Sequence, residues 1–381
     1  MIRAKAILII MLFSASWVLA EGDDTYRGLS NFTQVLDLIE RNYVEDVDPE
    51  RLTNSAIEGM VKTLDPYSAY LTPERYKELE IGTSGEFGGV GMEVTEEEGF
   101  LKVIAPIEGS PAAKAGIKPG DLILAINGKT TEGMAVFESV KLLRGPKGSN
   151  VKITLKREGE NSSIDLTLTR DIIHIESVKF DLFKGGIGYI KLSQFQEKVA
   201  EELINAVSNL EYKNGGMLKG LVLDLRNNPG GLLDEAIEVA DEFIDQGLIV
   251  SVKGRSPDQS KQYFATKGEN VHDYPIVVIV NKGSASASEV VAEALQDSNR
   301  ATILGSKTFG KGSVQTIIKL DDGSGLKITT AKFYAPSGRS INAIGVTPDV
   351  IIEDNDKRDL QMERAIELLK VSNLNNMFPR G

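Results

Sequence analysis

The sequence predicts an α/β protein of several domains, and three observations support this class. Residues 171–355 alternate apolar strand-like runs with helical patterns, as in GLVLDL followed by LLDEAIEVADEFI. Residues 83–170 read as short strands separated by glycine and proline turns, and residues 21–82 carry apolar side chains at helical spacing. Because strands that alternate with helices form a sheet covered by helices, we expect the main core at 171–355.

Length and composition agree with a globular chain that folds without disulfide bonds. The 381 residues leave room for two or three domains, 41% of them are hydrophobic, and there is no cysteine. The net charge of −12 argues against nucleic acid as a partner. The acidic runs 96–98 and 353–356 lack the glycine of a calcium loop, and no His pair has metal-binding spacing. No metal and no other cofactor is therefore expected.

Residues 1–20 have the three-part pattern of a secretory signal peptide. Arg3 and Lys5 precede the apolar run Ala6–Phe13, and residues 18–20 (VLA) end in small side chains suited to signal peptidase. The apolar run is too short to span a bilayer comfortably, and a retained anchor is the alternative. The protein is expected to be exported to the periplasm or cell envelope, and to be membrane-associated if the signal is not cleaved.

Two further segments are expected to be helical. In NFTQVLDLIERNYV the apolar residues Phe32, Val35 and Ile39 lie on one face of a helix, and the tail 356–381 continues the pattern with Leu360 and Leu369. Helices this short are marginal alone, so they are expected to pack on the rest of the chain or on a second copy. A homodimer is therefore an open alternative.

The stretch NKGSASASEVVAEAL, residues 281–295, raises the question whether one of its serines is a nucleophile. Glu289 follows Ser286 by three residues, which is the spacing of a capping box. In the first interpretation Ser286 is a helix cap and nothing more. The same position would also let Ser286 attack a carbonyl group while the amide of Ala287 binds the oxyanion. The pattern leaves both alternatives open.

A nucleophilic serine needs a base, and the chain has two histidines. His174 lies in a predicted strand and His272 in a polar loop, and neither sits in a recognisable catalytic pattern. The other candidate is Lys311, which lies between two glycines; an ordinary lysine has a pKa near ~10.4 and serves as a base only in a dry site. If TFGKGSVQ is extended, Gln315 shares a face with Lys311 and holds its amine. An exposed lysine on a glycine-rich loop is the alternative.

Two glycine-rich turns add backbone donors. In DLRNNPGG the amides of Gly230 and Gly231 are candidates for a second oxyanion donor, and a plain strand–helix connection is the alternative. The segment FGGVGMEV offers a backbone nest for a terminal carboxylate and a strand to which a peptide adds, and its spacing does not fit a dinucleotide site. The predicted peptide-binding residues are Gly88, Gly89, Val90, Gly91 and Met92.

Several motifs together resemble the carboxy-terminal processing (tail-specific) proteases, which are serine endopeptidases with a Ser–Lys dyad and a PDZ domain. The segments FGGVGMEV and SPAAKAGIKPGDLILAINGK are similar to the PDZ domain. The segments DLRNNPGG, NKGSASASE, TFGKGSVQ, YAPSGRSI and GVTPDV are similar to the protease core, in the family's order. The resemblance covers nearly the whole mature chain and implies a ClpP/crotonase-like core with an inserted PDZ domain at 83–170.

The resemblance also implies roles for single residues. Ser286 would be the nucleophile, Lys311 the general base, and Gln315 the residue that orients the lysine. The amide of Ala287, with that of Gly230 or Gly231, would form the oxyanion hole.

The partners implied by the resemblance are proteins or peptides with apolar C-termini, which the PDZ domain binds. An adaptor protein is an open alternative. Arg144, which follows the PDZ helix, is a hypothetical switch residue that reports peptide occupancy, and a solvated arginine at a helix end is the alternative. The rival function is a peptide-binding scaffold that leaves its peptides intact.

Overall fold

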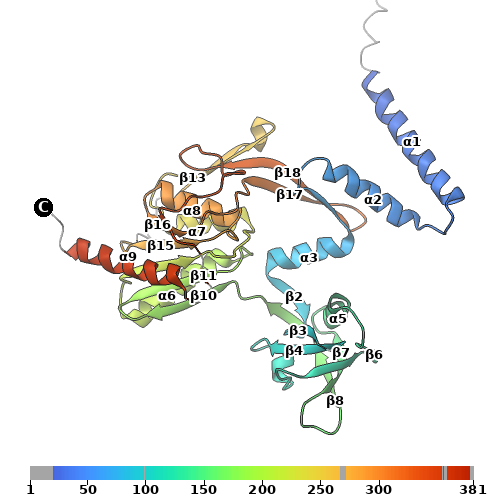
Figure 1. Ribbon diagram of the computed structural model, residues 1–381, viewed down its shortest axis with the longest axis horizontal. Helices are drawn as coiled ribbons and strands as arrows, with labels where there is room; N and C mark the ends of the chain where they lie inside the picture. The colour runs from blue at the N-terminus through green and yellow to red at the C-terminus, as the bar shows by residue number, and fades with distance from the viewer. Residues whose placement is uncertain (1–19, 98, 267–271, 354, 356–357, 378–381) are drawn as a thin grey trace, which may run out of the picture. The chain divides into compact units, whose positions relative to one another are not determined.

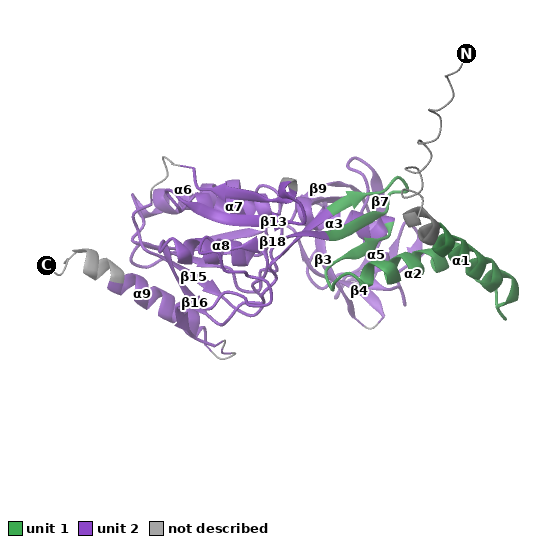
Figure 2. Ribbon diagram, turned by 90° about the horizontal axis from the view of Figure 1, so that it is seen from above, with its two compact units in different colours: residues 1–72, 317–328 green, residues 73–316, 329–381 purple. Residues whose placement is uncertain are grey.

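The computed structural model describes residues 20–97, 99–266, 272–353, 355 and 358–377 (Figure 1). The predicted signal peptide lies outside these residues, apart from Ala20, where the first helix begins. The chain divides into two compact units, residues 1–72 with 317–328 and residues 73–316 with 329–381 (Figure 2). None of the described helices is long and apolar enough to cross a membrane.

The first unit is built from two helices and a short strand. These are α1 (Ala20–Asn42), α2 (Pro49–Lys62) and β1 (Ala69–Leu71), which pairs antiparallel with residues 325–327 of β18. Helix α2 begins where the Asp48 carboxylate accepts a hydrogen bond from the Glu50 amide, with Pro49 in the first turn. The predicted helical spacing in α1 produces a row of exposed apolar side chains: Tyr26, Leu29, Phe32, Val35 and Leu38.

A six-stranded sheet is the centre of the second unit. Its strands, in spatial order, are β10 (Val178–Phe183), β11 (Ile187–Leu192), β12 (Gly220–Asp224), β15 (Ile276–Val280), β16 (Ala301–Gly305) and β19 (Val350–Ile351). Only the first pair is antiparallel. Every residue of β12 and β15 is buried, as expected for parallel strands covered on both faces.

Helices cover both faces of this sheet. Helices α6 (Val199–Asn214), α7 (Leu233–Asp241) and α8 (Ala287–Asp297) share a core cluster with Leu221, whereas α9 (Leu360–Met377) packs Leu369 in a second cluster with Val222. Successive residues of one strand point to opposite faces, which explains the two clusters. Because β12 and β15 are parallel neighbours, the segments that follow them, DLRNNPGG and NKGSASASE, meet at one edge of the sheet.

A second group of strands lies beyond α7 and α8. It contains β13 (Leu248–Gly254), β14 (Lys261–Phe264), β17 (Ser313–Lys319) and β18 (Gly325–Tyr334), with a 3-10 turn at Pro257–Gln259. Strand β13 pairs with β14 and with residues 331–334 of β18. Strand β17 begins only at Ser313, so Lys311 lies ahead of the strand, in an irregular segment.

Residues 83–170 contain a separate small sheet. Its strands are β3 (Met92–Glu97), β4 (Phe100–Pro106), β5 (Leu122–Ile126), β6 (Lys129–Thr130), β7 (Asn150–Lys156) and β8 (Ile164–Thr169), accompanied by α4 (Pro111–Lys114) and α5 (Val136–Leu143). Strand β3 is at the edge of the order β3-β4-β5-β7-β8. The chain forms a hairpin at Asn127 and Gly128, where both residues have positive φ and β5 pairs with β6.

This small sheet is connected to the rest of the second unit by a two-stranded ribbon. Strand β2 (Glu86–Gly89), which follows helix α3 (Pro73–Ser84), pairs antiparallel with β9 (Asp171–His174). The ribbon therefore holds the two ends of the inserted region together. The domain boundaries expected from the sequence stay predictions.

Candidate active site

Ser286 lies between β15 and α8, in a backbone conformation that non-glycine residues rarely adopt. Its φ and ψ are 56° and −114°. Such a conformation costs about 1–3 kcal/mol and persists only where the surroundings enforce it. Strain of this kind is often found at functional positions, so the backbone singles out Ser286 among the three serines of SASAS.

The other two serines are used to hold the turn after β12. The hydroxyl of Ser284 donates to the carbonyl of Leu225 at 2.8 Å, and that of Ser288 donates to the carbonyl of Asn228 at 3.0 Å. Both serines are completely buried, whereas Ser286 keeps 8% of its surface exposed. Their hydroxyls have a structural use, and Ser286 is the one serine of the three that keeps exposed surface.

The predicted capping box is present at the start of α8. The Ser286 amide donates to Oε2 of Glu289 at 2.8 Å, and the Glu289 amide donates to the Ser286 carbonyl oxygen at 2.9 Å. The Glu289 side chain therefore takes part in capping its own helix.

The segment that carries Lys311 is fixed by its two glycines. A Cβ atom on Gly312 would lie 2.2 Å from the amide nitrogen of Asn342, and Gly310 has a φ of +91°. The carbonyl of Gly310 accepts from the Ala343 amide at 2.8 Å. Close approach of two backbones is the reason for glycine on both sides of the half-buried Lys311.

One carboxylate joins this segment to the serine turn. Oε2 of Glu289 accepts from the amides of both Ser286 (2.8 Å) and Lys311 (2.9 Å). Its other oxygen accepts from the Gly310 amide at 2.7 Å and from Oγ1 of Thr308 at 2.5 Å. The backbones of the predicted nucleophile and the predicted base thus meet on one buried side chain.

Gln315 lies on β17, and its side-chain amide has two acceptors. Nε2 donates to Oγ of Ser313 at 2.8 Å and to Oγ1 of Thr329 at 3.4 Å. These bonds direct Nε2 toward Ser313. The side-chain carbonyl oxygen of Gln315 is therefore the atom that can accept a hydrogen bond from a lysine amine. The predicted role of Gln315 stays a prediction.

The turn DLRNNPGG packs against the serine. A Cβ atom on Gly230 would come within 2.8 Å of Cβ of Ser286 and 2.9 Å of the Ala287 amide nitrogen. The Gly230 amide itself donates to Oδ1 of Asn228 at 2.9 Å. No described residue accepts a hydrogen bond from the Gly231 amide. Of the two glycines, Gly231 therefore has the amide that is not already engaged in this conformation.

Asn228, which the sequence analysis did not single out, holds this turn in place. It is completely buried, and its Nδ2 donates to the carbonyl of Leu192 at 2.9 Å. Its own carbonyl accepts from the Ala285 amide at 3.0 Å and from Ser288. Most of these partners are far away in the sequence, so local pattern does not reveal the role of Asn228. The only local signal is its place before proline in the turn sequence NNP.

An ion-pair cluster anchors the start of the same turn. Nη2 of Arg226 lies 2.6 Å from Asp224 and 2.9 Å from Asp359, just before helix α9. Burial alone would lower the pKa of Arg226, but hydrogen bonds with both carboxylates outweigh it and raise that pKa. Burial, with the adjacent Asp224 carboxylate, raises the pKa of the Tyr189 hydroxyl, which donates to Asp224 at 3.0 Å.

The two histidines have partners elsewhere. Nδ1 of His174 lies 3.2 Å from Glu86, and Nε2 of His272 lies 2.8 Å from Glu242. Neither is hydrogen-bonded to the serine turn or to the lysine segment among the interactions of the described residues. In the same part of the chain, no three His, Asp or Glu side chains gather as a metal ion would require.

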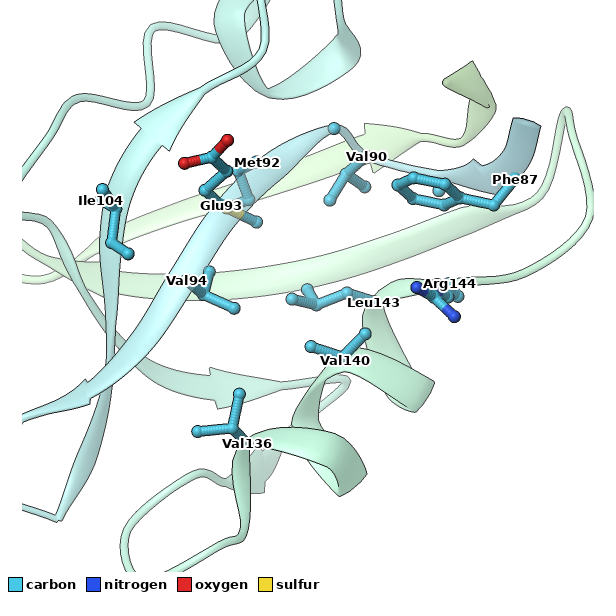
Figure 3. A pocket seen from close by; sticks show the side chains of 12 residues that line it. Phe87, Val90, Met92, Glu93, Val94, Ile104, Val136, Val140, Leu143 and Arg144 are labelled. Carbon is cyan, nitrogen blue, oxygen red and sulfur yellow. The ribbon is translucent and has the colours of Figure 1, made fainter. Parts of the chain in front are cut away.

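The predicted peptide-binding region forms a pocket of about 400 Å³ between β3 and α5 (Figure 3). The side chains of Val90, Val94 and Val140 point into it, and its apolar lining is completed by Met92, Ile104, Val136 and Leu143. Four of the five predicted residues line the pocket. The exception is Gly88, which lies outside the lining, in the ribbon, where a Cβ atom would clash with the carbonyl of Gly145 at 2.2 Å.

Arg144 ends α5 at the mouth of this pocket. Its Nη1 pairs with Glu78 of α3 at 2.5 Å, and its guanidinium lies 4.8 Å from the centre of the Phe87 ring. At the end of α3, the carbonyl of Gly82 accepts from the side chains of Gln194 and Gln196, each at 3.2 Å. Arg144 is thus paired with a helix and partly exposed, and its role as a switch stays a prediction.

Phe195, which lies between Gln194 and Gln196 in the chain, contacts the glycine turn DLRNNPGG. The Phe195 amide donates to the carbonyl of Gly230 at 2.9 Å, and its carbonyl accepts from the Leu232 amide at 2.8 Å. A chain of direct contacts therefore runs from the pocket, through α3, to the turn beside Ser286.

Comparison with known proteins identifies three regions of the chain, which correspond to the central sheet with its helices, the small sheet and the N-terminal helices. Residues 186–352 match the model of peptidase family S41, residues 102–157 that of a PDZ domain, and residues 17–75 that of the activating protease CtpB N-terminal domain. The carboxy-terminal-processing protease of Bartonella bacilliformis is 46% identical over 331 residues, which cover 87% of this chain and 76% of that protein.

Two further relatives have related names. The carboxy-terminal processing protease CtpA of Bacillus subtilis is 41% identical over 334 residues, covering 87% of this chain and 70% of that protein. The solved structure of a photosystem II D1 C-terminal processing protease is 34% identical and covers 84% of this chain and 92% of that one, with a TM-score of 0.48.

The matches to the family models and to the two named bacterial proteases confirm the predicted fold class, a multidomain α/β protein with a PDZ domain and an N-terminal helical segment, and the predicted serine-type peptidase. The rival interpretation, a scaffold without enzymatic activity, is not supported. The chain belongs to the carboxy-terminal processing proteases of peptidase family S41.

Proposed function

We propose that this protease is exported, holds the apolar C-terminal tail of a protein substrate in its PDZ pocket, and cleaves peptide bonds with a Ser286–Lys311 dyad. One observation supports the dyad above all. Ser286 has a strained backbone, and its amide shares the Glu289 carboxylate with the amide of Lys311.

The proposed reaction has two halves. Oγ of Ser286 attacks the carbonyl carbon while its proton moves to Nζ of Lys311. The negative oxygen is held by the amide of Ala287, at the start of α8, and by that of Gly231 or of Gly230. The C–N bond breaks as the lysine returns the proton to the leaving amine, and a water molecule then hydrolyses the acyl-enzyme by the same proton route. Gln315 orients the lysine in this proposal.

The proposed occupant of the PDZ pocket is an apolar tail with a free carboxylate. The pocket is lined mainly by aliphatic side chains, and β3 is an edge strand to which a peptide strand can add. The test is cleavage of a peptide with an apolar C-terminus, followed by mass spectrometry. Val140→Glu, which places a charge in the pocket, is expected to raise KM about tenfold or more for this peptide.

The matched control for this test is Lys141→Ala on the same helix, because Lys141 is exposed and outside the lining. It is expected to leave KM unchanged. An unaltered KM in Val140→Glu would contradict tail binding at this pocket, whatever the state of the catalytic residues.

The proposed base predicts the direction of the pH dependence. A protonated lysine cannot accept a proton, so kcat/KM is expected to fall about tenfold per unit below the pKa of the base and to rise to a plateau above it. His174→Ala, which removes an exposed histidine, should leave the profile unchanged. A rise in activity that disappears in His174→Ala or His272→Ala would assign the base to histidine instead.

Arg144 is proposed to transmit peptide occupancy from the pocket to the glycine turn. Arg144→Ala removes the contact with Glu78, so stimulation of cleavage by a saturating tail peptide is expected to fall about fivefold or more. Lys147→Ala, which removes a pair with Asp171 close by, is the control. Full stimulation of Arg144→Ala at saturating peptide would leave Arg144 with a packing role only.

The location and the assembly of the enzyme are proposed from two features of the N-terminal region. The signal-like segment supports export to the periplasm or cell envelope, with membrane association if the segment is retained. The exposed apolar row on α1 supports a homodimer that buries it. An adaptor protein that delivers substrates is compatible with the pocket.

A further inference from the structure

We propose that Glu289 is a positioning residue that sets the distance between nucleophile and base, and is more than the cap of a helix. The inference rests on the proposed Ser286–Lys311 dyad. A cap of α8 requires only the bond from the Ser286 amide. The three other donors to Glu289 come from the segment that carries Lys311: the amides of Lys311 and Gly310, and the hydroxyl of Thr308. Capping does not explain these three bonds.

The number of bonds and the burial make this carboxylate rigid. Each oxygen accepts two hydrogen bonds, at distances of 2.5 to 2.9 Å, and the residue is completely buried. A buried carboxylate with all its donors satisfied can move only if several bonds break together. The backbone amides of Ser286 and Lys311 are therefore both bound to one rigid carboxylate, that of Glu289.

The attachment also explains how the strained serine is maintained. The Ser286 amide is held by Oε2 of Glu289, while Val290 and Glu289 donate to the Ser286 carbonyl. Residues of α8 therefore hold both the amide and the carbonyl group of Ser286, which fixes its unusual φ and ψ. The Lys311 amide binds the same oxygen as the serine amide, so a shift of the glutamate would move the nucleophile and the base apart.

The neighbouring turn of the helix offers a matched control. Glu293 lies four residues further along α8, is 4% exposed, and pairs with Arg339 at 2.6 Å. It has no hydrogen bond with the serine turn or with residues 308–311 in the described part of the chain. The two glutamates have a similar size, charge and depth, but only Glu289 joins the catalytic segments.

The first experiment compares Glu289→Gln with Glu293→Gln in the full-length protein. A glutamine at 289 keeps the shape but turns an NH2 group toward two of the four donors. A small displacement of catalytic groups costs on the order of 10²-fold in rate, so kcat per active site is expected to fall by about that factor while KM stays within twofold of the wild type. Glu293→Gln is expected to keep kcat.

The readout separates positioning from simple stability. Active sites are counted by labelling with a fluorophosphonate, so unfolded molecules do not enter kcat, and the labelling rate of Ser286 is expected to fall in parallel with kcat. Binding of a tail peptide to the PDZ pocket should not change. A kcat per active site within twofold of wild type, or an equal loss in both glutamine variants, would overturn the proposal.

If Glu289→Gln does not fold, Thr308 gives a milder test. Thr308→Val removes one donor to the carboxylate, whereas Thr308→Ser keeps the hydroxyl. The valine variant is expected to lose about tenfold in kcat and the serine variant less than twofold; equal activities would overturn the proposal. Ser286→Ala is assayed beside them. If it remains active, the dyad itself has failed; if it is inactive while the Glu289 or Thr308 variants are normal, only this inference has failed.

Discussion

Ser286→Ala is expected to abolish cleavage of a tailed peptide, with a fall in kcat on the order of 10⁴-fold or more and an intact fold. The reason is that no acyl-enzyme forms without Oγ. Lys311→Ala should produce a loss of similar size, since the hydroxyl then has no proton acceptor, and the double variant should be no worse than either single one because the two groups act as a unit. The measurement is single-turnover cleavage, with circular dichroism to check folding.

Lys307→Ala is the matched control for the base. Lys307 lies four residues before Lys311, on the same segment, and is exposed. Its removal is expected to leave kcat unchanged. If activity survives in Ser286→Ala but is lost in Ser284→Ala, the nucleophile is Ser284 and the assignment of Ser286 is wrong, although Ser284 is buried and its hydroxyl donates to the carbonyl of Leu225.

Gly230→Ala is expected to reduce kcat about 10²-fold to 10³-fold, which is the effect of losing one oxyanion donor. The new methyl group would lie 2.8 Å from Cβ of Ser286 and 2.9 Å from the Ala287 amide nitrogen, and the φ of +99° is strained for alanine. It would therefore push the turn away from the place where the oxyanion forms. Single-turnover acylation per labelled active site is the appropriate measurement.

Gly59→Ala serves as the control for a glycine-to-alanine change. Gly59 lies in α2, and apart from its chain neighbours and the nearby backbone of the helix no atom lies within 4 Å of the position a Cβ would take there. Its kcat should match that of the wild type. An acylation rate of Gly230→Ala within a few-fold of the wild type would mean that the turn has room to relax, and that it takes no direct part in binding the oxyanion.

Much of the fold was predictable from local pattern. The runs GLVLD and IVVIV contain only apolar residues up to the closing aspartate, which is typical of parallel strands covered on both sides, and both strands are completely buried. The Asn-Gly hairpin follows from the positive φ that both residues tolerate. The start of α8 follows from the spacing of Ser286 and Glu289, although the backbone of Ser286 itself is strained. The path of TFGKGSVQ could not be predicted from its own pattern, because contacts with residues 342–345 hold its glycines in an irregular segment.

The order of the domains, the family, and the short set of residues from which a nucleophile, a base and oxyanion donors would come could be predicted from the sequence. These depend on local spacing and on motifs that are contiguous in the chain. Only the folded chain reveals which amide of the glycine turn is already bound to Asn228, and that Glu289 binds the serine and lysine segments together. Those contacts join residues from different loops, and their existence depends on how parallel strands bring loop ends to one edge of the sheet, which no local pattern encodes.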